Sequence, residues 1–231
     1  MTARDDILDS IRRGLGRGRL ADGAAGAVEA RLAEHKRNLI PARAAALDPP
    51  ARVELFVAMA EAVQASVARV ASERDVPAEV ARFLAAENLP AELTVAPDSA
   101  LDALPWAERP LLQIRRGKAE PGDAVSLTPC LAGIAETGTL MLVSGEGTPT
   151  TLNFLPDTHI VMLRAGEVVA TYEDGWDLLR GRPGERPAEL PRTVNFITGP
   201  SRTGDIEQKI ELGAHGPRRL HVILVGDARQ A

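Results

Sequence analysis

Six short apolar runs, separated by longer segments, constrain the fold of this chain more than any other feature. They cover residues 93–96, 111–114, 140–143, 160–163, 194–198 and 220–225. Strands covered on both faces read as nearly continuous apolar runs, and helices are the usual connections between parallel strands. The pattern therefore predicts an α/β fold with a mostly parallel, Rossmann-like sheet and flanking helices.

Helical periodicity accounts for much of the remaining sequence. Apolar residues spaced by about 3.6 positions predict a long helix over 50–71, and another helix is expected over 77–88. The expected crossover helices between strands are 149–155, 172–180 and 205–212.

The first 48 residues are expected to form a helical extension. Helical apolar patterns lie at 5–15 and 28–40, with a flexible tether rich in glycine, alanine and arginine between them. A proline pair at 49–50 is typical of a domain border. The main α/β domain is therefore expected over 50–231.

Charge and length narrow the range of partners and locations. The formal net charge is −5, and the arginines are scattered rather than gathered into a basic block, which argues against nucleic acid as a partner. No apolar run approaches the roughly 18 residues that a membrane span needs, and the charged start lacks the apolar core of a signal peptide. We expect a cytoplasmic protein with no membrane span.

The cysteine and histidine content indicates neither a metal site nor a cofactor. The single cysteine, Cys130, cannot form an internal disulfide, and an iron–sulfur cluster usually takes four cysteine thiolates. The four histidines have neither metalloprotease spacing nor a cysteine partner. One of them, His221, lies inside an apolar run and is interpreted as a core histidine whose polar atoms are satisfied.

The loop at 199–204 is the first candidate site, because it follows an expected strand at the end where open α/β sheets bind ligands. Free N–H groups at the start of the next expected helix, with Arg202 nearby, would suit a carboxylate or phosphate. The alternative is that Ser201 or Thr203 only caps that helix, while Asp205 and Glu207 occupy its positive end.

A second candidate is the turn that contains Glu136. Thr137 and Gly138 lie between two apolar stretches and read as a hairpin turn in which the glycine supplies a positive φ. A carboxylate beside a cleft can act as a general base, a nucleophile or a cation ligand. The alternative is that Glu136 is solvated or bonded to turn amides.

Two further loops contain polar residues beside expected helix ends. Thr148 is expected to cap a helix that begins at Pro149, and its loop lacks the Walker and dinucleotide glycine patterns, so nucleotide binding is not indicated. His215 follows an expected helix stop, where it would reach the ligand edge of the sheet or cap the helix. The polar loops are expected along one rim of the central sheet.

Four separated motifs carry a resemblance to a known family. They are Ala135–Thr139, Leu155–Ile160, Gly199–Glu207 and Gly213–Pro217. In their order and spacing the chain resembles the lactate utilization protein C family, whose shared module is the LUD domain, over about residues 50–226. The charged start at 4–8 is also similar to the family's beginning.

The resemblance implies a fold like that of the NagB/RpiA/CoA-transferase superfamily. It also implies participation in L-lactate oxidation to pyruvate, beside two partner subunits that carry iron–sulfur motifs. The site positions that match the family motifs are Glu136, Thr137, Gly138, Thr139, Gly199, Pro200, Ser201, Arg202, Thr203, Asp205, His215, Gly216 and Pro217.

Three functional hypotheses follow, and whether the chain is itself an enzyme stays open among them. The first is a non-redox component of a lactate-oxidising complex, in which Arg202, the amides near Ser201 and His215 bind a small carboxylate. The alternative is a free-standing transferase or ligase with Glu136 as nucleophile or base and glycine-rich loops that hold CoA or nucleotide phosphates. The third is a regulatory or scaffold module with a vestigial pocket.

Overall fold

The computed structural model describes residues 2–18, 22–37, 39–182, 190–206 and 209–226. The chain divides into two compact units, Met1–Leu39 and Ile40–Ala231.

The first unit contains the two helices expected near the start of the chain. Helix α1, Ala3–Gly14, begins with a capping box in which Thr2 and Asp5 bond reciprocally. The backbone and side-chain hydrogen bonds from Thr2 lower the pKa of the Asp5 carboxyl. Helix α2, Asp22–Glu34, begins and ends earlier than its apolar pattern predicts. Its alanine-rich sequence has high helix propensity, which outweighs the glycines. The expected tether includes residues 19–21, which lie outside the described part.

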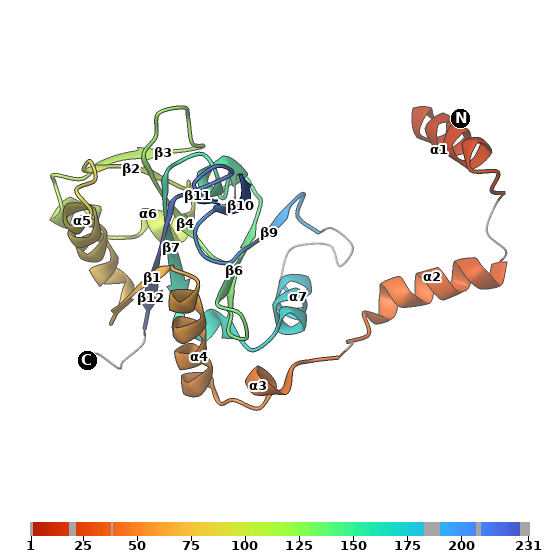
Figure 1. Cartoon of the computed structure of the whole chain (residues 1–231), viewed down its shortest axis with the longest axis horizontal. Helices are drawn as coiled ribbons and strands as arrows, with labels where there is room; N and C mark the ends of the chain where they lie inside the picture. Colours follow the sequence, from red (N-terminus) through yellow and green to blue (C-terminus); the bar gives the residue numbers. More distant parts are fainter. Residues whose placement is uncertain (1, 19–21, 38, 183–189, 207–208, 227–231) are drawn as a thin grey trace. The chain divides into compact units, whose positions relative to one another are not determined.

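The second unit is built on a six-stranded sheet in which every neighbouring pair is parallel. In spatial order its strands are β1 (Ser66–Val70), β12 (Arg219–Val225), β7 (Thr158–Arg164), β4 (Val125–Pro129), β2 (Glu92–Val95) and β3 (Gln113–Arg116). The predicted α/β fold with a mostly parallel central sheet is confirmed (Figure 1).

Two of the six apolar runs belong to a second, smaller sheet rather than to the central one. Its order is β8 (Val168–Val169), β5 (Ala132–Ile134), β6 (Thr139–Val143) and β9 (Val194–Ile197). β5 and β6 pair antiparallel around the Gly138 turn, and β9 adds antiparallel to β6. The continuous apolar character of β6 has the same origin as in the central sheet, because both of its faces are covered.

Helices cover one face of the central sheet, and a further helix together with the second sheet covers the other face. Helices α5 (Val76–Ala86) and α6 (Ser99–Asp102) share one apolar cluster with β2, β4, β7 and β12. Helix α4 (Pro49–Ala62) and the second sheet cover the opposite face, and helix α7 (Tyr172–Arg180) packs on β5 and β6 with Leu179 and Met141 buried (Figure 1). A short helix, α3 (Ala42–Ala45), precedes α4.

Three of the expected helices are wrong in whole or in part. The helix expected over 50–71 ends at Ala62, because Gln64 takes a φ of +70° and the Ser66–Val70 segment pairs with β12 as strand β1. The segment expected at 149–155 holds only a 3-10 turn, Thr150–Asn153.

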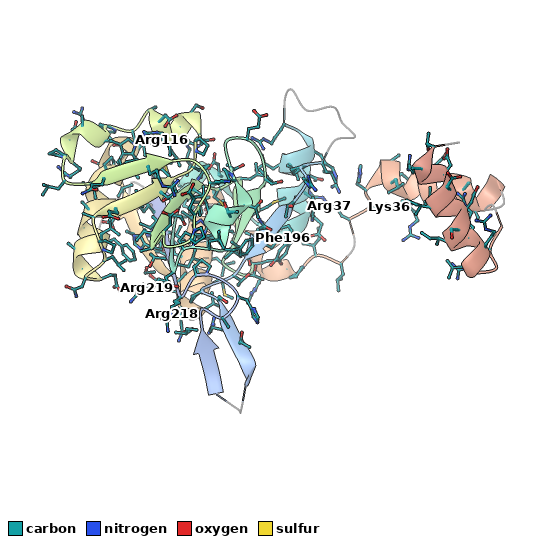
Figure 2. All side chains as sticks on the ribbon, turned by 90° about the horizontal axis from the view of Figure 1, so that it is seen from above. Lys36, Arg37, Arg116, Phe196, Arg218 and Arg219 are labelled. Carbon is teal, nitrogen blue, oxygen red and sulfur yellow. The ribbon has the colours of Figure 1, made fainter. Side chains whose placement is uncertain are left out.

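The third error lies at 205–212, where the structure has a two-stranded hairpin. Strand β10 (Arg202–Ile206) pairs antiparallel with β11 (Lys209–Leu212). Lys209–Leu212 alternates polar and apolar residues, the period of a strand, although the longer segment also fits a helix. In Figure 2 this hairpin projects from the body of the second unit.

Candidate functional site

The second sheet brings the Glu136 turn and the Gly199 loop to the same end. In the β6–β9 pair Leu140 lies opposite Ile197, so the start of β6 meets the end of β9. The Thr139 and Thr198 hydroxyls are hydrogen-bonded at 2.6 Å. The two predicted loops are therefore neighbours, although about 60 residues of sequence separate them.

A shared network of hydroxyl groups stiffens this junction. The Thr139 hydroxyl is 2.7 Å from that of Thr137 and 3.1 Å from the phenol of Tyr172, and it is fully buried. Thr137 also lies 3.1 Å from the Tyr172 hydroxyl. Hydroxyls that both donate and accept can satisfy one another in a buried site, so these threonines act first as structural links.

The loop that contains His215 joins the same junction through hydrogen bonds with Ser201. The Ser201 amide donates to the Pro217 carbonyl at 2.8 Å, and the Gly213 amide donates to the Ser201 carbonyl at 3.0 Å. The His215 amide reaches the Ser201 hydroxyl at 3.4 Å. The motifs around Thr139, Ser201 and His215 therefore form one contiguous region.

A cavity of about 420 Å³ opens where these loops meet. Its polar lining residues are Asn153, His159, Thr198, Ser201, Arg202 and His215. Its apolar lining includes Phe154, Phe196, Ile197 and Leu220. A cavity of this size with several convergent polar groups is large enough for a small molecule.

The cavity is not at the rim of the central sheet where a ligand was expected. His159 and Leu220 are the second residues of β7 and β12, so the cavity lies at the amino-terminal ends of these strands. The loop at 199–204 does follow the carboxyl end of a strand, but that strand is β9 of the second sheet. The predicted location at the carboxyl ends of the central strands is therefore wrong, whereas the predicted convergence of the loops is correct.

The expected anion cradle at a helix start is also wrong. Arg202 begins β10, whose Arg202 and Thr203 pair with Leu212 and Glu211, so no helix begins in this loop. His215 follows a strand rather than a helix. In the neighbouring loop the Thr148 hydroxyl donates to the Val143 carbonyl at 2.8 Å and caps no helix.

Two glycines allow the loops to pack against the end of α4. Gly138 has a φ of +64°, and a Cβ there would lie 2.2 Å from the Ala60 nitrogen. Gly199 has a φ of +73°, and a Cβ there would lie 2.4 Å from the Val63 carbonyl oxygen. The predicted positive φ at Gly138 is confirmed, and at both positions the close approach excludes any side chain.

Arg202 is oriented by the same helix end. Its Nη2 donates to the Val63 carbonyl at 2.8 Å, at the carboxyl terminus of α4 where carbonyls lack partners. A guanidinium has five N–H donors, so this bond fixes the side chain and leaves other donors for a ligand.

His159 is a site residue that the sequence reasoning missed. Its side chain is fully buried, Nε2 lies 2.8 Å from the Thr128 hydroxyl, and Nδ1 has no partner among the described residues. Burial lowers the pKa of the imidazole to about 3, so the ring is neutral near pH 7. The signal was present, since His159 belongs to the Leu155–Ile160 motif, but a histidine in an apolar run reads first as core.

The remaining predicted positions lie outside the cavity lining. Glu136 is 5% exposed, and its carboxylate accepts from the Tyr172 amide at 3.4 Å, while Arg43 donates to its carbonyl. Thr203 and Asp205 are in β10, and the side chain of Asp205 lies outside the described part. Gly199, Pro200, Ser201, Arg202 and His215 line the cavity.

The described ranges contain no candidate metal centre and no candidate membrane span. No three His, Cys, Asp or Glu side chains there form a group suited to a metal ion. No helix within those ranges has the length and apolar character to cross a membrane. A second cavity, of about 350 Å³, lies along β2 and β3 and contains none of the predicted site residues.

Comparison with known proteins gives one consistent family. Residues 53–225 match the LUD domain. The protein called lactate utilization protein C in Geobacillus sp. (strain WCH70) is 36% identical over 94 residues, which are 41% of this chain and 39% of that protein. The protein of the same name in Deinococcus radiodurans is 35% identical over 114 residues, 49% of this chain and 51% of that protein. The matched stretches thus span about 40–50% of the length of these relatives.

A solved structure shares the fold. It is the crystal structure of a duf162 family protein from Deinococcus radiodurans, with a TM-score of 0.55 and 23% sequence identity, covering 78% of this chain and 99% of that one. At this identity the likeness supports the architecture described above.

Proposed function

The chain belongs to the LUD domain family, and on that premise we propose that it is a cytosolic, non-redox component of an L-lactate utilization system that binds a small carboxylate. Curated relatives named lactate utilization protein C support the pathway. The resemblance noted in the sequence is confirmed by the family match.

The observation that carries the proposal is the convergence of the family-like loops on one cavity. Ser201, Arg202 and His215 come from two separate motifs and line the same cavity. A guanidinium and hydroxyl or amide donors are the groups that recognise carboxylates, and Arg202 is already held by α4. The site thus offers donors for an acid without needing a helix terminus.

The environment of Cys130 supports a proposal in which partner subunits, rather than this chain, hold the iron–sulfur clusters. Cys130 is buried, and its Sγ donates to the Ala132 carbonyl at 3.0 Å. Burial raises the pKa of this thiol to about 12, so it stays protonated and is a poor ligand for iron. In this proposal the iron–sulfur subunits of a lactate-oxidising complex carry the electrons.

Glu136 has no catalytic role in the proposal. Its carboxylate faces the first amide of α7 and is outside the cavity lining, so a covalent step on a ligand in the cavity would require a rearrangement. Among the described residues, no contact of Glu136 favours the transferase or ligase alternative.

Affinity purification from cells grown on L-lactate tests the partners. We expect iron-containing proteins to co-elute with the tagged chain, and deletion of its gene to abolish growth on L-lactate. Absence of iron-containing partners together with normal growth on L-lactate would refute the proposal.

Two single arginine variants, compared in the same strain, distinguish a loss of ligand binding from a loss of folding. Arg202→Ala should impair growth on L-lactate while partners still co-elute, because it removes a donor from the cavity. Arg109→Ala is the matched control, since Arg109 also donates to a main-chain carbonyl, that of Glu108, and does not line the cavity. Equal growth of the two variants would remove the carboxylate site from the proposal.

A further inference from the structure

The cavity is larger than lactate requires. If each heavy atom of a ligand took the volume of a liquid water molecule, about 30 Å³, lactate would occupy about 180 Å³. The cavity measures about 420 Å³, so more than half of it would remain unfilled. By the same measure a phenyl-substituted lactate would take about 360 Å³.

The lining divides into a polar part and an aromatic part. Ser201 and Arg202 supply hydrogen-bond donors, while Phe154, which is 40% exposed, supplies an aromatic surface. The ring of Phe196, labelled in Figure 2, packs instead on Tyr172 at 5.2 Å and Trp176 at 5.7 Å, on the α7 face of β9. A partly exposed phenylalanine beside polar groups suits a ligand that carries both an acid group and a ring.

Gly216 keeps the space between these two parts open. A Cβ at this position would lie 3.4 Å from Ser201 Cβ and 3.7 Å from Phe154 Cδ1. A methyl group would therefore fit in ordinary contact, but a longer side chain would enter the space between Ser201 and Phe154. The glycine has no positive φ, so conformation alone does not require it.

His159 also lines the cavity and adds a nitrogen that has no hydrogen-bond partner in the part of the chain that the structure describes. Its Nε2 is engaged by the Thr128 hydroxyl, and its Nδ1 is buried without a partner among the described residues. Buried polar atoms normally have a partner, so a ligand atom is the natural complement to Nδ1. The ring is neutral near pH 7, because burial lowers its pKa to about 3, and a neutral group matches a hydroxyl or carbonyl better than a second carboxylate.

We propose that the ligand of this cavity is an aryl-substituted 2-hydroxy or 2-oxo acid. Its carboxylate binds near Ser201 and Arg202, its ring packs on Phe154, and its hydroxyl or carbonyl oxygen pairs with His159 Nδ1. This inference rests on the proposed carboxylate site and specifies its chemical class.

A ligand series tests the three contacts separately by isothermal titration calorimetry on the full chain. Phenyllactate should bind roughly tenfold or more tightly than L-lactate, because the ring buries apolar surface. Phenylpropionate, which lacks the hydroxyl, should bind more weakly than phenyllactate. Binding of L-lactate that equals or exceeds that of phenyllactate would overturn the inference and leave the proposed function intact.

Variants of His159 test the hydroxyl contact. His159→Leu should abolish the preference for phenyllactate over phenylpropionate, and His159→Asn should restore part of it, because the asparagine amide lies near the position of Nδ1. A preference that survives in both variants would overturn the role of His159.

Variants of Gly216 keep the test decisive if His159→Leu does not fold. Gly216→Leu should weaken phenyllactate binding by roughly tenfold or more and affect L-lactate less, whereas Gly216→Ala should bind both nearly as the parent does. Thermal unfolding of each variant verifies that it is folded. Unchanged phenyllactate binding in folded Gly216→Leu would place the ring elsewhere and contradict the proposal.

Discussion

At the scale of single residues, buried polar groups were the hardest to interpret from sequence. The expectation that His221 is a satisfied core histidine is confirmed, since Nδ1 lies 2.8 Å from the Ser66 hydroxyl and Nε2 lies 3.2 Å from Glu79. His159 sits in a similar apolar run, but one of its nitrogens is unpaired. The difference depends on neighbours from other strands, which the local sequence does not contain.

His159 predicts a specific dependence of stability on pH. The folded ring has a pKa of about 3 against 6.5 for the free side chain, so the unfolded chain takes up a proton first as pH falls. The free energy of unfolding is therefore unaffected by this group above about pH 6.5 and decreases toward pH 3, by roughly 1.4 kcal/mol per pH unit. Urea unfolding of the parent and of His159→Asn should show this excess slope only in the parent.

The window from pH 6.5 to 4.5 is the informative one. Below it Glu79 also contributes: burial raises the pKa of its carboxyl, but hydrogen bonds from Arg82 and His221 outweigh this and lower it to about 2. Stability from Glu79 is therefore present above pH 4.5 and lost toward pH 2. Parallel pH profiles for the parent and His159→Asn above pH 4.5 would contradict the assignment of His159 as buried and neutral.

At the scale of elements, the apolar runs predicted β2, β3, β7 and β12 of the central sheet and β6 and β9 of the second sheet, and helical periodicity predicted α7. They did not predict β1, β4 or the β10–β11 hairpin. The run at 220–225 and the helix at 172–180 were correct because their own residues specify them. The hairpin at 202–212 was not predicted, because its sequence fits both a helix and a strand. Strands such as β1 depend on pairing with distant partners, so propensity alone does not identify them.

Close packing against the end of helix α4 predicts which glycine substitutions lower the free energy of unfolding most. Gly138→Ala should lower the free energy of unfolding by about 1–3 kcal/mol more than Gly226→Ala does, measured by urea unfolding. Both glycines have a positive φ, +64° and +80°, but only Gly138 faces backbone, that of Ala60. Similar losses for the two variants would mean that conformation, rather than packing on α4, explains the cost.

At the scale of the whole molecule, the three hydrophobic clusters draw all their members from one part of the chain. Their buried residues lie between Val53 and Val225, within the second unit. The same interval matches the LUD domain. The fold and the candidate cavity are therefore properties of this interval.

Removal of residues 1–39 tests whether the second unit folds and binds its ligand without the first. A chain that begins at Ile40 should keep the thermal unfolding midpoint of the full chain within about 3 °C, because no core side chain is lost. It should also bind phenyllactate with unchanged affinity. A large drop in the midpoint would show that residues 1–39 contribute to the stability of the second unit.

The central claim is that sequence-distant loops form one acid-binding cavity. Backbone amide NMR on the isotope-labelled chain, titrated with L-lactate and then with phenyllactate, tests it most directly. The account predicts saturable shifts that concentrate at Thr198, Ser201, Arg202, His215 and Gly216. Shifts confined to residues 92–94 and 113–115 around the second cavity, or no saturable shifts with either acid, would contradict it.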